Sequence, residues 1–98
     1  MDVIWTDRAQ LRLDEIYAYI AEDQPQRAKE WVGRLIERGD AVSSQPWAGR
    51  KVPEYEEDTI REVFLGDYRV IYEITSTTIY ILTVRHGSQL LPFQVSEV

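Results

Sequence analysis

The spacing of apolar residues changes once along this chain of 98 residues, from a helical period before Asp58 to a strand period after it. The first half carries apolar residues at the i, i+3, i+4 and i+7 positions that share one face of a helix: Leu13, Ile16, Tyr17 and Ile20. The second half concentrates β-branched and aromatic residues in three runs that predict strands: residues 60–65, 68–74 and 78–84. This order predicts an α+β domain, in which helices cover one face of a sheet.

Two helices are predicted before residue 46, and each has its own start signal. Thr6 fits the N-cap of the first helix, because its hydroxyl can accept a hydrogen bond from a free N–H of the first turn. Pro25 fits the first turn of the second helix, where its missing N–H costs nothing. A second apolar stripe follows it: Ala28, Trp31, Val32, Leu35, Ile36 and Val42. Gly33 and Gly39 each weaken a helix by roughly 1 kcal/mol relative to alanine, so they either mark a close contact or a bend or are tolerated at the surface.

Short turns link the predicted strands, with a two-residue hairpin signal at Gly66-Asp67 and a slightly longer turn at residues 75–77. Residues 47–53 have Gly and Pro at turn positions and are expected to form a loop. A chain this short supports one core. We therefore expect a single domain over residues 1–98, with an N-terminal strand, a two-helix antiparallel hairpin and a mainly antiparallel sheet with three C-terminal strands.

The last predicted strand is apolar on both faces, although the helices can cover only one. Side chains alternate along a strand, which predicts one set on each face: Ile79, Ile81, Thr83 and Arg85 against Tyr80, Leu82 and Val84. An uncovered apolar face typically marks a contact with another protein. The alternative is that the segment Leu90–Phe93 folds back over this face.

Composition excludes several kinds of chemistry. Cysteine is absent, which rules out disulfides, thiolate catalysis and sulfur-rich zinc sites. Because His86 is the single histidine, little material remains for a metal site, and we expect no metal and no cofactor. The net charge of −6 argues against broad attraction to nucleic-acid phosphates, although the three basic residues after Asp58 are all arginines.

No apolar run approaches the roughly 18 residues that a membrane span needs. The N-terminus also lacks the basic and apolar regions of a signal peptide. These features lead us to expect a cytoplasmic protein that does not contact a membrane.

Several short motifs, in order, resemble the ParE branch of the RelE/ParE toxin family. In the second half they are Pro-x-x-Gly-Arg-x-Val-Pro-Glu at residues 46–54, Ile60-Arg61-Glu62, Gly66-Asp67-Tyr68-Arg69-Val70-Ile71-Tyr72, residues 79–87 and Leu90-Leu91. In the first half they are Trp5-Thr6, Ala9, Ile16, Tyr19-Ile20, Pro25 and Ala28. The resemblance covers about 90 of the 98 residues, and no single motif is diagnostic by itself.

The resemblance implies the toxin half of a type II toxin–antitoxin system, of the kind associated with plasmid stabilization. A cognate ParD-like antitoxin is expected to wrap the toxin in a hetero-oligomer, and DNA gyrase is the expected target. Such toxins have no recognised catalytic residues, and we expect no direct sequence-specific binding of nucleic acid by the toxin alone. The candidates for target binding are Arg61, Arg69, Arg85 and His86. The candidates for antitoxin binding are Ile71, Ile79, Ile81, Leu90 and Leu91.

One alternative is the activity of the RelE branch, which cleaves messenger RNA in the ribosomal A site. That reaction needs a proton acceptor, a proton donor and cations that stabilise the phosphorane. The strand arginines supply cations, and Arg69 and Arg85 lie near one another on adjacent strands if the register permits. Proton-transfer groups are few, because His86 and two tyrosines, Tyr68 and Tyr80, are the candidates. This scarcity weighs against a ribonuclease.

A second alternative is a non-toxic module that keeps only the antitoxin-binding surface. Relatives often carry further arginines after the His-Gly pair, where this chain has Ser88-Gln89. Purely structural roles also remain open: ion pairs of Arg61 with Glu62 and of Arg69 with Glu73, and a structural hydrogen bond at His86. If the arginines face the target instead, their replacement by alanine should reduce toxicity and leave antitoxin binding intact.

Overall fold

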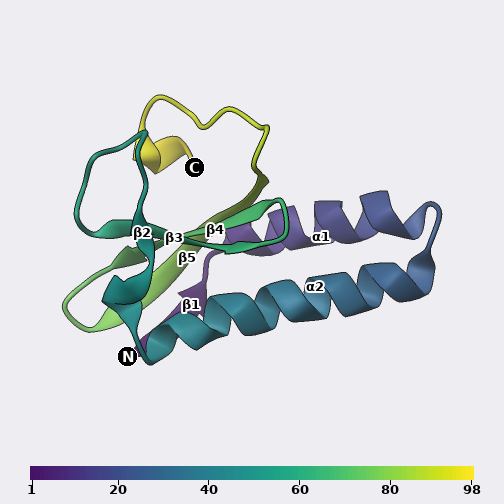
Figure 1. The fold of residues 1–98 in the computed structure, drawn as a ribbon, viewed down its shortest axis with the longest axis horizontal. Helices are drawn as coiled ribbons and strands as arrows, with labels where there is room; N and C mark the ends of the chain where they lie inside the picture. Colours follow the sequence, from purple (N-terminus) through teal and green to yellow (C-terminus); the bar gives the residue numbers. More distant parts are fainter.

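A two-helix hairpin lies across one face of a five-stranded sheet in the computed structural model, which describes residues 1–98 (Figure 1). The helices are α1 (Asp7–Ala21) and α2 (Pro25–Asp40), and the strands are β1 (Asp2–Trp5), β2 (Arg50–Lys51), β3 (Ile60–Leu65), β4 (Tyr68–Ile74) and β5 (Thr78–His86). Three short 3-10 turns complete the chain: η1 (Ala41–Ser43), η2 (Pro46–Ala48) and η3 (Val95–Glu97). The predicted α+β class and element order are confirmed.

The strands lie in the order β1-β5-β4-β3-β2. Strands β2, β3, β4 and β5 pair antiparallel with their neighbours, whereas β1 pairs parallel with β5. The sheet is therefore mainly antiparallel, as predicted. The two-residue strand β2 lies in the segment predicted to be a loop, and it pairs with Arg61 and Glu62.

The helices begin where the sequence predicted. The Thr6 hydroxyl accepts a hydrogen bond from the N–H of Ala9 at 3.1 Å, and Pro25 occupies the first turn of α2. Their apolar stripes pack on the sheet, where the core includes Leu13, Leu35 and Tyr72. Neither helix has both the length and the apolar character needed to cross a membrane.

A β-bulge changes which side chains share a face of β5. Ile71 pairs with Thr83 and Tyr72 pairs with Ile81, so Leu82 is skipped in the register. The bulge places Leu82 and Thr83 on the face of Ile71, away from the helices, and returns Val84 to the helix face. The predicted strict alternation is therefore wrong beyond Ile81, because an extra residue in one strand shifts every later side chain by one position.

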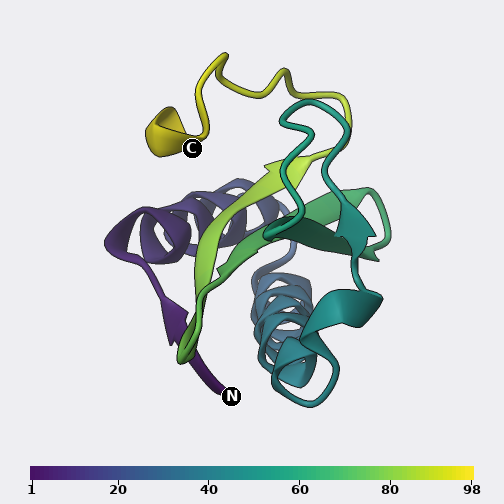
Figure 2. The ribbon, with the colours of Figure 1, turned by 90° about the vertical axis from the view of Figure 1, so that its left-hand side faces the viewer.

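The face of the sheet opposite the helices, hereafter the second face, is covered by the chain itself. Val52, Ile60 and Ile71 form a small buried cluster there, and Leu91 packs against it. In Figure 2 the C-terminal segment and the loop between β2 and β3 lie on the side of the sheet away from α2. The Tyr55 hydroxyl donates to the Pro92 carbonyl at 2.8 Å and joins these two segments. The expectation of an uncovered face is wrong, because the C-terminal segment folds back over it.

Candidate functional site

Four charged side chains form a connected set of ion pairs on the second face. Glu62 of β3 is 1% exposed and accepts hydrogen bonds from Nε of Arg69 at 2.6 Å and from Arg50 at 2.7 Å. Two further nitrogens of Arg69 donate to the two carboxylate oxygens of Glu54, at 2.8 and 2.9 Å. Adjacent strands hold Glu62 and Arg69, whereas Glu54 comes from the loop after β2. All three nitrogens of the Arg69 guanidinium are therefore bonded to carboxylates.

These hydrogen bonds perturb the acid–base behaviour of both partners. Donation by Arg69 lowers the pKa of Glu54 from its ordinary value. The same hydrogen bonds, followed by those with Glu62, raise the pKa of Arg69. Both carboxylate partners therefore favour the charged form of Arg69.

Arg61 is bound by main-chain carbonyls and not by a carboxylate. Its Nε donates to the Asp58 carbonyl at 2.7 Å, and another nitrogen donates to the Gly49 carbonyl at 3.2 Å. The guanidinium carbon lies 5.2 Å from the centre of the Trp47 ring, a cation–π distance. The prediction that Arg61 pairs with Glu62 is wrong, because neighbouring residues of a strand point to opposite faces of the sheet.

Arg85 of β5 faces Arg69 directly across the strand pair, so the register permits the proximity that the sequence left open. The predicted ion pair of Arg69 with Glu73 is wrong, since Glu54 and Glu62 take its donors. Arg85 has one hydrogen bond, to the Leu90 carbonyl at 3.4 Å, and its Nε is buried without a partner. Burial, with a smaller effect of nearby arginines, lowers the pKa of Arg85.

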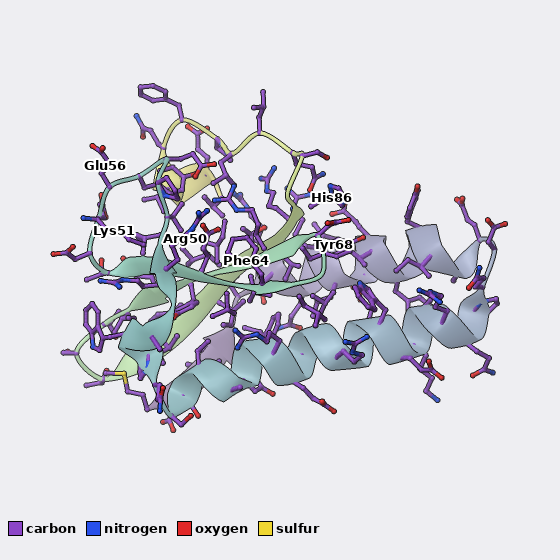
Figure 3. All side chains as sticks on the ribbon, viewed as in Figure 1. Arg50, Lys51, Glu56, Phe64, Tyr68 and His86 are labelled. Atoms are coloured by element: carbon purple, nitrogen blue, oxygen red, sulfur yellow. The ribbon has the colours of Figure 1, made fainter.

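His86 lies on the helix face, apart from the strand arginines. Its ring packs edge-on against Tyr68 at 5.5 Å between centroids, and the two side chains lie together at the α1 end of the sheet in Figure 3. The N–H of Ser88 donates to Nδ1 of His86 at 3.2 Å, so that nitrogen is the acceptor. A hollow of about 620 Å³ opens beside the ring and is also lined by Trp31. The structure thus gives His86 a local hydrogen-bonding role and does not bring it to the arginines.

The five apolar candidates for antitoxin binding occupy three different environments. Ile79 and Ile81 are fully buried in the core beneath the helices. Ile71 is fully buried beneath the C-terminal segment, with Leu91 partly buried beside it. Leu90 is 91% exposed. Ile79 and Ile81 can reach no partner while the fold is intact, and Ile71 can do so only if the C-terminal segment moves.

Sequence reasoning missed Arg50, Glu54 and Glu62 as members of the ion-pair set. A signal for Glu62 exists, because it alternates with Ile60 on one face of a strand that is otherwise largely apolar. Glu54 carries no such signal, since its pairing with Arg69 depends on how a loop folds. No group of three or more acidic or histidine side chains is arranged to hold a metal ion.

Tyr55, on the second face, is poorly suited to proton transfer. Its hydroxyl donates a hydrogen bond to the Pro92 carbonyl of the C-terminal segment. Burial raises the pKa of Tyr55 further above neutrality. A phenol with a raised pKa is a poor general base at neutral pH.

Comparison with known proteins identifies several similar chains. Residues 3–91 match the model of the ParE toxin family, described as the ParE toxin of the type II toxin–antitoxin system parDE. A protein of Sinorhizobium fredii (strain NBRC 101917 / NGR234), named "Putative toxin Y4kP", is 43% identical over 90 residues, which is 90% of each chain. A solved structure of the chromosomal ParDE system from P. aeruginosa has the same fold, with a TM-score of 0.76 and 22% identity over 88% of this chain and 95% of that one.

Proposed function

This chain belongs to the family of ParE toxins of type II toxin–antitoxin systems, and from that premise we propose that it acts by binding DNA gyrase and not by cleaving RNA. The observation that carries the proposal is that two of the three strand arginines, Arg61 and Arg69, are already held by hydrogen bonds within the fold. Arg69 is bonded to two carboxylates and Arg61 to main-chain carbonyls. Neither is free to stabilise the charge that develops on a phosphate during cleavage.

The placement of His86 supports the same proposal. It lies on the helix face, whereas Arg69 and Arg85 lie on the second face. A general base must lie within hydrogen-bonding reach of the proton that it removes, and the cations must contact the same phosphate. A target that is bound through protein surfaces requires no such arrangement.

A ParD-like antitoxin is the proposed partner, in a hetero-oligomer that neutralises the toxin. The solved relative from P. aeruginosa is named as a ParDE system. Leu90 and Phe93 are 91% and 96% exposed in this chain, and apolar side chains presented in this way favour contact with another protein. With gyrase as target, the toxin acts in the cytoplasm.

A gyrase cleavage assay tests the proposal. Purified protein, gyrase and supercoiled plasmid are incubated with ATP, and linear DNA is measured after denaturation. We expect linear DNA to accumulate with the toxin and to disappear when excess antitoxin, the product of the neighbouring gene, is added. An absence of linear DNA, with active gyrase and folded toxin, rejects gyrase as the target.

Two further measurements separate the alternatives. Primer extension on translated messages after induction should show no cuts in the ribosomal A site, and such cuts would indicate the RelE activity instead. Induced expression without antitoxin should stop growth. Normal growth with a high level of folded protein would indicate a non-toxic antitoxin-binding module.

A further inference from the structure

A hollow of about 620 Å³ lies between the helical hairpin and one end of the sheet. Tyr19 of α1 and Trp31 of α2 line it from the helices, whereas Tyr68 and His86 line it from β4 and β5. Figure 3 shows the last two side chains where the sheet meets α1. We call these four side chains the aromatic walls. The volume falls within the roughly 300–1,000 Å³ that ligand sites in proteins occupy.

The rings of the aromatic walls adjoin at angles and do not stack flat on one another. The ring centroids of Trp31 and Tyr68 lie 6.4 Å apart, with their planes at 57°. Those of Tyr68 and His86 lie 5.5 Å apart, with their planes at 85°. Rings at these angles form separate walls of the hollow that they line. Because the face of an aromatic ring carries partial negative charge, such walls favour a cation.

Asp67 supplies the only carboxylate that lines the hollow, and no lysine or arginine lines it. The residue is exposed and takes part in none of the ion pairs of the fold. Its main-chain carbonyl accepts a hydrogen bond from the N–H of Gly87 at 2.6 Å, which fixes the turn beside the end of β5. Burial first, and then the charges of Tyr19 and Asp67, raise the pKa of Tyr68. The unpaired carboxylate therefore lies close to the aromatic walls.

Arg34 packs on one of the aromatic walls without filling the hollow. Its guanidinium carbon lies 4.9 Å from the centre of the Trp31 ring, a cation–π distance. Arg34 does not line the hollow and forms no ion pair with Asp67. The Trp31 ring thus already accepts a guanidinium, while the hollow itself contains no cation of this chain.

We propose that this hollow binds an arginine side chain of the antitoxin. Arginine fits the site better than lysine, because a planar guanidinium stacks on aromatic rings while its N–H groups donate to a carboxylate, here that of Asp67. A nucleic acid fits poorly, since Asp67 and the net charge of −6 repel its phosphates. The same net charge attracts a basic segment of a protein.

The antitoxin is the partner because the family of this chain implies one. Residues 3–91 match the ParE toxin of a type II toxin–antitoxin system, and the solved relative from P. aeruginosa is named as a ParDE system. The inference therefore rests on the antitoxin of the proposed function and is independent of gyrase. A negative gyrase assay leaves it standing.

The first test is an NMR titration of the full chain at constant ionic strength. The probe is N-acetyl-arginine methylamide, and the matched control is N-acetyl-citrulline methylamide, in which a neutral urea of nearly the same shape replaces the guanidinium. We expect the indole N–H signal of Trp31 to shift saturably with the arginine probe alone. The indole signal of Trp5, whose N–H donates to Asp40 at 2.8 Å, should not move. Equal shifts of Trp31 with both probes, or no saturable shift, overturn the proposal.

The variant Asp67→Asn removes the carboxylate with almost no change of shape. The main-chain hydrogen bond to Gly87 is retained, so the turn should fold as before. Asp2→Asn is the matched control, because it removes the same charge beside Thr78, at the opposite end of β5. We expect the D67N variant to bind the arginine probe about tenfold more weakly than the D2N variant, the effect of losing one charge-assisted hydrogen bond. Equal affinities of the two folded variants contradict the proposal.

Calorimetry with the full-length antitoxin, the product of the neighbouring gene, tests whether the arginine comes from this partner. We expect the D67N variant to bind the antitoxin about tenfold more weakly than the wild type, and the D2N variant to stay within about twofold of it. An antitoxin that binds the D67N variant as tightly as the wild type overturns this inference and leaves the antitoxin as the partner. An antitoxin that does not bind the wild type rejects the partner itself, and this inference with it.

Discussion

Arg69 and Arg85 are direct cross-strand partners on the second face of the sheet. Two like charges at opposed positions of a strand pair ordinarily destabilise it. Here Glu54 and Glu62 neutralise Arg69, whereas Arg85 is bonded only to a main-chain carbonyl. The same residue type is therefore held in two ways at paired positions: Arg69 by two carboxylates, and Arg85 by one main-chain carbonyl.

Replacement of Arg69 by alanine should destabilise the fold strongly. Glu62 is almost completely buried and would keep only the exposed Arg50 as a partner, so the cost should lie toward the lower end of the roughly 3–5 kcal/mol of breaking a buried ion pair. Urea unfolding of R69A, followed by circular dichroism, measures the loss. The sequence alone left open whether this variant loses only toxicity or also its fold, and the buried position of Arg69 predicts the loss of the fold.

Arg61→Ala is the matched control for that measurement. Arg61 is only partly buried and its hydrogen bonds go to carbonyls, so its removal should cost about 1 kcal/mol. Equal losses of stability in the R61A and R69A variants would show that the carboxylates bonded to Arg69 stabilise the fold no more than the carbonyls bonded to Arg61 do.

The stability of the fold should fall in acid as Glu54 is protonated. Hydrogen bonds from Arg69 lower the pKa of Glu54 in the folded state below its ordinary value of 4.5. A carboxylate with a depressed pKa contributes stability above its unfolded pKa and loses that contribution as the pH falls through the folded pKa. The free energy of unfolding should therefore decrease from about pH 4.5 downward. Glu54→Gln should flatten this part of the profile, and a profile as steep as that of the wild type would assign the effect to other carboxylates.

Two glycines of α2 should respond to alanine in opposite directions. A Cβ at Gly33 meets nothing within 4 Å, so Gly33→Ala should stabilise the helix by roughly 0.5–1 kcal/mol. A Cβ at Gly39 would lie 2.4 Å from the ring of Trp5, which itself donates to Asp40 at 2.8 Å. Gly39→Ala should therefore cost roughly 1–3 kcal/mol through overpacking. Thermal unfolding of the two variants checks both signs, and a stabilised G39A would show that Trp5 moves aside freely.

The helices and strands were predictable because their signals are local. Thr6 marks a helix start by accepting a hydrogen bond from the first turn, and Pro25 marks one because it has no N–H to satisfy there. The parallel pairing of β1 with β5 joins segments more than seventy residues apart, and no local pattern records it. The bulge at Leu82 is likewise a property of the strand pair, so it altered the predicted faces without altering the predicted strand.

The candidate site was predictable only in part, for a related reason. Arg69 and Arg85 were candidates for neighbours because they lie on adjacent predicted strands, and the observed register pairs them directly. The partners of Arg69 were not predictable, because Glu54 lies in a loop whose path is fixed only when the chain folds. The prediction that the second face is uncovered was wrong for a similar reason. Leu91, which packs against the cluster containing Ile71, lies in a C-terminal segment whose apolar residues have no helical or strand period.

The C-terminal segment should pack less tightly on the second face when Tyr55 loses its hydroxyl. That hydroxyl donates to the Pro92 carbonyl at 2.8 Å and links the loop after β2 to the C-terminal segment. Tyr55→Phe removes this hydrogen bond, which contributes roughly 0.5–1.5 kcal/mol, but keeps the ring that packs on the small cluster. We expect faster hydrogen exchange at residues 90–98, and unchanged exchange in α1 and α2. Tyr72→Phe is the control, because its hydroxyl donates to the Pro46 carbonyl at 2.6 Å, away from the C-terminal segment. Faster exchange of the C-terminal segment in both variants, or in neither, would mean that the Tyr55 hydroxyl does not fix this segment on the second face.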